Sequence, residues 1–149
     1  MSLIYLDYNC FQRGFDDQRQ IRIQMEALAC QEIFNRAERR ELQLVWSFMH
    51  KDETILCPFP ERKIEVFRLS NLCEKRVCPN EEIYNYAMSF QTGANLSAKD
   101  AVHLACASYT KAKFFLTCDD EVIKRAKRLS LDIRIINPVD YIREEDKLK

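Results

Sequence analysis

Apolar and polar positions follow one another along the chain in blocks that predict alternating strands and helices. Four short apolar runs, at residues 3–6, 42–46, 113–117 and 133–136, have the length and composition of buried strands. A fifth, very short strand is expected around residues 77–78. Between these runs, apolar residues recur every three or four positions, which predicts amphipathic helices packed on the strands.

The longest helical pattern spans residues 21–37, and its stripe begins with Ile21, Met25 and Leu28. Ser47, Asn80 and Ser97 are expected to cap later helices, and Gly93 is expected to end one. The charged residues 143–149 are expected to form a frayed tail. The other helices are expected at these positions: from Ser47 to about 56, 61–73, from Asn80 to Gly93, from Ser97 onward, 119–129, and a short turn at 139–142.

Strands that alternate with helices favour a mainly parallel sheet covered on both faces, which is an α/β fold. The chain of 149 residues is long enough for one sizeable core. With only 2 glycines and 4 prolines it has little room for linkers. We therefore expect a single domain over residues 1–142, followed by the tail.

Charge and cysteine content narrow the possible functions. Basic and acidic side chains number 23 each, so binding to a nucleic acid would need a local patch or metal ions. The 7 cysteines include no CxxC pair, which favours buried free thiols in a reducing cytoplasm. A zinc site made by Cys73, Cys78 and a histidine is a less favoured alternative. No signal peptide or membrane-spanning run is evident, so a soluble cytoplasmic protein is expected.

Acidic residues stand where the predicted strands end. Asp7 follows the first strand and Asp119 follows the strand at 113–117, while Asp100 and Glu53 lie in helices near the same edge. Clustered carboxylates repel one another unless cations offset the charge. Mg²⁺ and Mn²⁺ prefer oxygen ligands and can generate a hydroxide that attacks a phosphodiester. For any one of these acids taken alone, however, helix capping is the favoured explanation, so the metal-site hypothesis rests on their joint placement.

Four segments resemble motifs of PIN domains, and they occur in the same order. The segment Leu6-Asp7-Tyr8-Asn9 looks like the opening of such a domain, and residues 96–105 resemble its D-A-x-H-L-A helix. Residues 115–120 are similar to its hydrophobic-T-x-D strand end, and the closing Ile-Ile-Asn-Pro segment at 135–138 also fits. The resemblance spans essentially the whole chain.

This resemblance implies a three-layer, Rossmann-like α/β/α fold and a metal-dependent endoribonuclease. It also implies the toxin of a toxin–antitoxin pair, with a cognate antitoxin and a homodimer as partners. Asp7, Asp100 and Asp119 match the family's acidic metal ligands. Asn9 matches the polar partner of the first acid, and Thr117 matches a supporting hydroxyl.

The family's second acid lies in the helix after the second strand and follows a Ser or Thr. Glu53 after Ser47 fits this pattern, and Asp52 is its competitor. Tyr8 departs from the family because a small Thr or Ser is common there, which could alter access to the site.

Two further residues have assigned supporting roles. His103 shares a helix face with Asp100 at a spacing of three residues, and we interpret it as a core residue or one that supports a metal ligand. Asp120 is interpreted mainly as a helix cap beside Asp119.

Other classes of protein fit less well. A response-regulator receiver needs paired acids after its first strand and a lysine where Asn137 stands. A haloacid dehalogenase-type phosphatase needs an acid at Asn9. The remaining alternative is a catalytically weakened PIN-like module that binds RNA or protein.

Overall fold

Five parallel strands form the centre of the molecule. The structure is a computed structural model and describes residues 1–147. The strand order is β3-β2-β1-β4-β5, so the first strand of the chain lies in the middle of the sheet. The strands are β1 (Leu3–Leu6), β2 (Gln43–Ser47), β3 (Lys75–Val77), β4 (Phe114–Leu116) and β5 (Arg134–Ile136).

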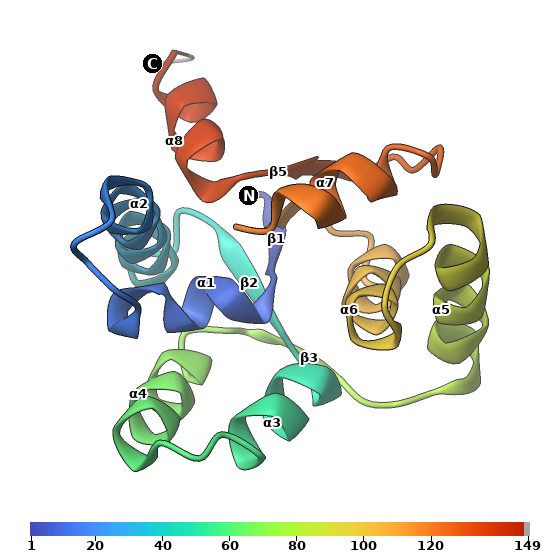
Figure 1. Cartoon of the computed structure of the whole chain (residues 1–149), viewed down its shortest axis with the longest axis horizontal. Coiled ribbons are helices and arrows are strands. Elements are labelled where there is room, and N and C mark those ends of the chain that lie inside the picture. Colours follow the sequence, from blue (N-terminus) through green and yellow to red (C-terminus); the bar gives the residue numbers. More distant parts are fainter. Residues whose placement is uncertain (148–149) are drawn as a thin grey trace.

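Helices cover both faces of this sheet and make three layers (Figure 1). α2, α4 and α8 lie on one side, and α5, α6 and α7 lie on the other. The α/β/α architecture predicted from the alternating pattern is therefore confirmed, with every strand pair parallel. The helices are α1 (Tyr8–Gln12), α2 (Ile21–Glu38), α3 (Phe48–Ile55), α4 (Pro60–Ser70), α5 (Glu81–Ala94), α6 (Ala98–Tyr109), α7 (Asp120–Ala126) and α8 (Pro138–Lys147), with a 3₁₀ turn at Arg13–Phe15.

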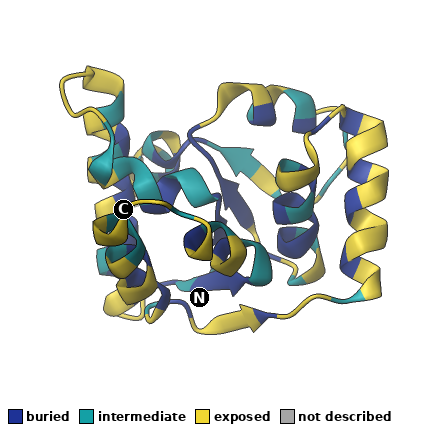
Figure 2. Ribbon diagram, turned by 60° about the horizontal axis from the view of Figure 1, so that its bottom comes forward, coloured by how far each residue is buried: buried dark blue, intermediate teal, exposed yellow. Residues whose placement is uncertain are grey.

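The two cores on either side of the sheet follow from strand geometry. Successive side chains of a strand point to opposite faces. Ile4 and Leu6 of β1 therefore pack toward α2 and α4, while Tyr5 packs toward α5 and α6. All three are fully buried, and Figure 2 shows the buried strands between helices whose outer surfaces are exposed.

One short helix was not predicted, and the end of another was predicted wrongly. The polar stretch after Asp7 contains α1, which is too short for a periodic pattern to reveal it. Gly93 does not end α5, because the helix continues to Ala94 and closes on Asn95 in the left-handed conformation, with φ 54°. A Cβ atom at Gly93 would lie 3.1 Å from Leu129 Cδ2, so its small size serves close packing.

The charged C-terminal segment was also predicted wrongly. Instead of a short turn followed by a frayed tail, α8 runs from Pro138 to Lys147, and the last two residues of the predicted tail lie outside the described residues. Tyr141 anchors it, being 3% exposed, with its ring 5.0 Å from that of Phe114 in an edge-on arrangement. Arg36 of α2 also pairs with Asp146, at 3.3 Å.

Part of the apolar stripe predicted for α2 does not reach the core. Ile33 and Phe34 are buried, whereas Ile21, Met25 and Leu28 are 74%, 40% and 68% exposed. On α4, too, the apolar residues Ile64 and Phe67 are exposed, whereas Val66 and Leu69 are buried. Among residues 1–147, no helix is long and apolar enough to cross a membrane.

We expect Tyr141→Ala to destabilise the fold by about 3 kcal/mol, as is usual when a buried aromatic ring is deleted. Urea unfolding of the variant and the parent would measure this. Tyr141→Phe keeps the ring against Phe114 and should cost less than about 1 kcal/mol. Equal stability of Tyr141→Ala and the parent would show that α8 does not dock as described.

Candidate functional site

The candidate site lies at the carboxyl ends of the three central strands. Asp7 follows β1, Ser47 ends β2, and Thr117 follows β4. The register of β1 and β4 pairs Leu6 with Leu116, and the backbone N–H of Asp7 donates to the Leu116 carbonyl at 2.8 Å. Parallel pairing therefore brings residues 110 positions apart to one edge of the sheet.

Asp7 is a carboxylate held almost out of solvent, at 5% exposure. Its Oδ1 accepts a hydrogen bond from the Tyr8 backbone N–H at 2.7 Å, and its Oδ2 accepts one from the Thr117 hydroxyl at 2.8 Å. Burial raises the pKa of Asp7 and outweighs these hydrogen bonds. His103 lowers that pKa, and the nearby Asp100 carboxylate raises it to a smaller extent.

Thr117 and Asn9 hold the loops around Asp7 together. The single proton of the Thr117 hydroxyl goes to Asp7, and its oxygen accepts from Asn9 Nδ2 at 3.2 Å and from the Asp119 backbone N–H at 3.1 Å. Asn9 Oδ1 accepts from the Cys118 backbone N–H at 3.1 Å. The structure thus places both residues where the motif resemblance implies supporting partners of Asp7.

The two adjacent acids after β4 have different contacts. Asp119 is exposed and caps α7, its Oδ1 accepting from the Glu121 backbone N–H at 2.9 Å. The capping role predicted for Asp120 was therefore wrong. Asp120 points away and forms a two-pronged pair with Arg22 of α2, with both N···O distances 2.7 Å. Arg22 lowers the pKa of Asp120.

Glu53 reaches the site from α3 and is 12% exposed. Its Oε2 accepts from His103 Nε2 of α6 at 3.2 Å. Its Oε1 is buried without a hydrogen-bond partner; the Lys99 ammonium lies 3.4 Å away, within ion-pair range but not aligned for a hydrogen bond. The competitor Asp52 is exposed on the same helix.

A buried polar chain stands behind Glu53. The Tyr5 hydroxyl lies 2.6 Å from His103 Nδ1 and 2.8 Å from Ser47 Oγ. Because His103 Nε2–H donates to a carboxylate, its Nδ1 accepts from Tyr5, whose pKa burial raises well above the usual value. His50 Nε2 donates to the Leu6 carbonyl at 2.7 Å, and burial lowers the pKa of His50 well below its usual value.

The sequence motifs did not predict that Tyr5 and His50 belong to this buried polar network. Ser47 was expected to cap α3, and it does so, together with His50. A polar side chain inside an otherwise apolar strand, as at Tyr5, is the one feature of the sequence that could have pointed to a buried partner.

Tyr8 spans the opening between α1 and α3. Its hydroxyl is 3.0 Å from the Thr54 hydroxyl, which in turn donates to the His50 carbonyl at 2.7 Å. Gln12 Nε2 also donates to the Tyr8 hydroxyl at 3.2 Å. The large residue found where the family has a small one thus ties α1 to α3 at the edge of the site.

The three predicted ligands Asp7, Glu53 and Asp100 follow β1 or lie on α3 and α6, and Asp7 is the only one of them that is classed as buried. Asp100 is half-buried in the first turn of α6, and Ser97 Oγ caps its backbone N–H at 3.2 Å. Within the described residues, these carboxylate oxygens do not gather to within 4.8 Å of one another. The unpartnered Glu53 oxygen and the dry Asp7 carboxylate nevertheless fit a hard divalent ion.

Three buried thiols lie directly beneath the loops that carry Asp7 and Asp119. The sulfur atoms of Cys10, Cys30 and Cys118 all lie within 4.8 Å of one another. The nearness of the other two thiols and of the Arg13 guanidinium lowers the pKa of Cys118. The alternative zinc site at Cys73 and Cys78 does not form in the part of the chain that the structure describes, since Cys73 is buried and Cys78 is exposed.

The molecule is a three-layer α/β/α sandwich that carries acidic residues near the carboxyl ends of its strands. No protein-family model and no curated protein sequence matches the chain. Its backbone is similar to that of a chain in the crystal structure of VapBC2 from Rickettsia felis. In that structure, VapBC2 is bound to a DNA fragment from its own promoter. The TM-score is 0.59 at 12% identity, and the similarity covers 91% of this chain and 98% of that chain. VapC is a PIN-domain toxin, so the comparison confirms the PIN-like fold predicted from the motifs.

We expect Asp7→Asn to be more stable than the parent at neutral pH in EDTA. The folded protein binds a proton at Asp7 more tightly than the unfolded chain does. Stability therefore falls as pH rises from the unfolded pKa through the raised folded pKa, and the loss persists at neutral pH. Asparagine removes this loss, so the advantage should shrink as pH falls toward about 4.

Urea unfolding between pH 7.5 and pH 4 would measure the effect. Asp132→Asn, at an exposed aspartate, removes the same formal charge and serves as the control. A lower stability of Asp7→Asn at neutral pH would mean that its hydrogen bonds outweigh its burial.

Proposed function

We propose that the protein is a metal-dependent endoribonuclease of the PIN type. The observation that carries the proposal is a pair of carboxylates: Asp7, which is buried, and Glu53, whose Oε1 accepts no hydrogen bond and has the exposed Lys99 ammonium 3.4 Å away. Burying a carboxylate costs free energy that hydrogen bonds and one exposed ammonium offset only in part, and a divalent cation would offset it further. The PIN-like fold, shared with a chain of a toxin–antitoxin complex, supports the same reading.

Asp7, Glu53, Asp100 and Asp119 are the proposed ligands of Mg²⁺ or Mn²⁺. When bound, such an ion lowers the pKa of a water molecule and offsets the charge of a phosphodiester. Asp119 uses one oxygen to cap α7, which leaves the other for a ligand.

The surrounding residues position these acids. Thr117 and Asn9 fix Asp7, and His103 aims Glu53 from behind. His103 is fully buried with both ring nitrogens engaged, so it is a positioning residue rather than a base that touches the RNA.

The partners proposed with this activity are an RNA substrate, a cognate antitoxin and a second copy of the chain. The VapBC2 structure is that of such a pair. The exposed apolar residues Ile21, Met25 and Leu28 give α2 a surface suited to a protein partner. Such a protein would act in the cytoplasm.

A PIN-like binding module without catalysis is the second candidate. Tyr8 favours it, because its hydroxyl ties α1 to α3 where the family usually has a small residue. A module of this kind has no need of Mn²⁺.

The nuclease is tested with a labelled structured RNA incubated with Mn²⁺ or with EDTA. We expect cleavage only with Mn²⁺, and we expect Asp100→Asn to reduce it to the level seen in EDTA. This variant removes a carboxylate whose side chain makes no hydrogen bond in the described structure, so folding should be unaffected. A single-stranded DNA of the same sequence would show whether DNA is also cut.

Failure of several RNAs to be cleaved, combined with no Mn²⁺ binding by calorimetry, would refute the nuclease and favour the binding module. RNA binding without cleavage would support that module directly. Circular dichroism of Asp100→Asn separates lost chemistry from lost folding.

The second acid is tested by comparing Glu53→Gln with Asp52→Asn. Glu53 contacts His103 and Lys99 of α6, whereas Asp52 is exposed one position earlier on α3. We expect Glu53→Gln to lower Mn²⁺ affinity and RNA cleavage by at least about tenfold, since even outer partners of metal ligands commonly contribute that much. Asp52→Asn should match the parent in both measurements. The opposite pattern would assign the role to Asp52.

A further inference from the structure

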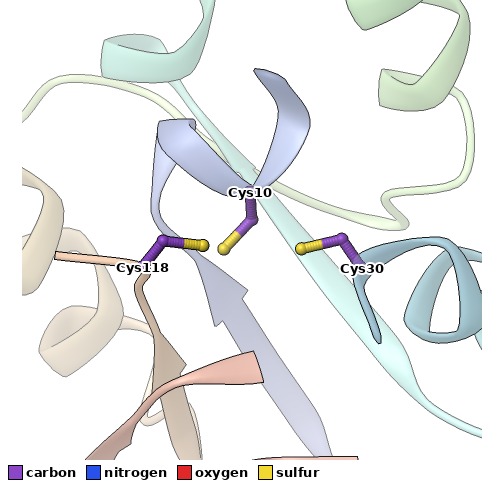
Figure 3. Close-up of side chains that lie close together, drawn as sticks. All are labelled: Cys10, Cys30 and Cys118. Carbon is purple, nitrogen blue, oxygen red and sulfur yellow. The ribbon is translucent and has the colours of Figure 1, made fainter. Parts of the chain in front are cut away.

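The three thiols beneath the candidate site come from three separate parts of the fold. Cys10 lies on α1, Cys30 lies on α2, and Cys118 lies in the loop between β4 and α7. Figure 3 shows the three sulfur atoms pointing toward one another across the space between these elements. All three residues are at most 4% exposed. The arrangement therefore depends on tertiary packing, not on closeness in the sequence.

Packing alone does not require this convergence. Cys73 and Cys106 are as deeply buried, yet neither joins a group of potential metal ligands within residues 1–147. A disulfide would use two of the three sulfur atoms and leave the third unused. Three converging thiols match the ligand set of a metal ion that prefers sulfur.

A pocket of about 380 Å³ gives access to the cluster. Cys10 and Cys30 line it, and so does Gly14, where an added Cβ atom would meet nothing within 4 Å. Glu61 and Glu65 of α4 also line the pocket, and although Glu65 is paired with Arg68, carboxylates at this opening attract cations. The cluster is thus buried yet reachable by a small ion.

We propose that Cys10, Cys30 and Cys118 bind one thiophilic d¹⁰ metal ion, Zn²⁺ or Cu⁺. Zinc–sulfur bonds of about 2.3 Å place sulfur atoms about 3.8 Å apart in a tetrahedral site, so the observed spacing closes with shifts of about 1 Å or less. Zn²⁺ would take its fourth ligand from water in the pocket, whereas three-coordinate Cu⁺ needs none. Binding displaces the thiol protons to solvent, with no change in oxidation state.

This site is independent of the proposed nuclease because its ligands are sulfur atoms, whereas Mg²⁺ and Mn²⁺ prefer oxygen. Either proposal can fail while the other holds. His50 and His103 are fully buried and hydrogen-bonded, so neither is a competing zinc ligand at the surface.

The test uses the full chain with Cys57→Ser and Cys78→Ser, which removes the two least buried thiols. The reduced, metal-free protein is titrated anaerobically with Zn²⁺ or with Cu⁺, and bound metal is measured by mass spectrometry. We expect one equivalent per chain of one of these ions. X-ray absorption should count three sulfur neighbours at about 2.3 Å if that ion is Zn²⁺.

Two further substitutions in this background locate the ligands. Cys30→Ser removes a sulfur from α2, away from the loops that carry the acids, and should weaken binding more than about 100-fold. Cys73→Ser alters an equally buried thiol outside the cluster and should leave binding unchanged. Circular dichroism checks the fold of both.

Absence of tight binding of either ion, or binding that Cys30→Ser does not weaken, would overturn the proposal. A sulfur count below three would also overturn it, and this measurement on the background protein stands even if Cys30→Ser fails to fold.

Discussion

The burial of one carboxylate at the end of the central strand constrains the rest of the site. β1 lies between β2 and β4, so Asp7 emerges where helices from both layers meet. A charge there must be stabilised by hydrogen bonds or cations. The Tyr8 backbone N–H and the Thr117 hydroxyl supply hydrogen bonds. These bonds do not fully offset the cost of burying the charge, because the pKa of Asp7 is still raised. The buried charge of Asp7 lowers the stability of the fold, and the same charge makes the position suited to a cation. Stability and the proposed function therefore place opposite demands on this residue.

A buried network of polar side chains connects β1 to the Glu53 side of the site. Tyr5 projects from β1 on the face opposite Leu6 and meets Ser47 and His103 in an otherwise apolar core. The side-chain polar atoms of Tyr5, Ser47, His50 and His103 all have hydrogen-bond partners. These bonds hold α3 and α6 in one relative position. Buried networks that are fully satisfied specify a single arrangement. The position of Glu53 is therefore set by its contact with the buried His103 and not by solvent-exposed neighbours.

Sequence periodicity was sufficient for the sheet and its two helical layers, because buried strands and amphipathic helices leave local patterns. It failed where the cause was not local. α1 is shorter than one and a half turns, and the end of α8 carries charges whose partners lie in α2. The motifs pointed to Asp7, Asp100 and Asp119, but adjacent Asp119 and Asp120 could be told apart only by their contacts with α7 and Arg22. The convergence of thiols 20 to 108 positions apart leaves no trace in a chain without CxxC pairs.

The same short segments carry the oxygen atoms of the candidate acidic site on one side and the thiols of the cysteine cluster on the other. Along α1, Asn9 turns toward Thr117 while Cys10 turns toward the core, and after β4, Cys118 is flanked by Thr117 and Asp119. Oxygen and sulfur ligands select different ions, so a thiophilic ion held below would not compete for the carboxylates above. Such an ion would instead hold α1, α2 and the β4–α7 loop in a common position. Because Asn9 and Thr117 depend on those same segments, the two clusters are coupled through the backbone even though they share no ligand.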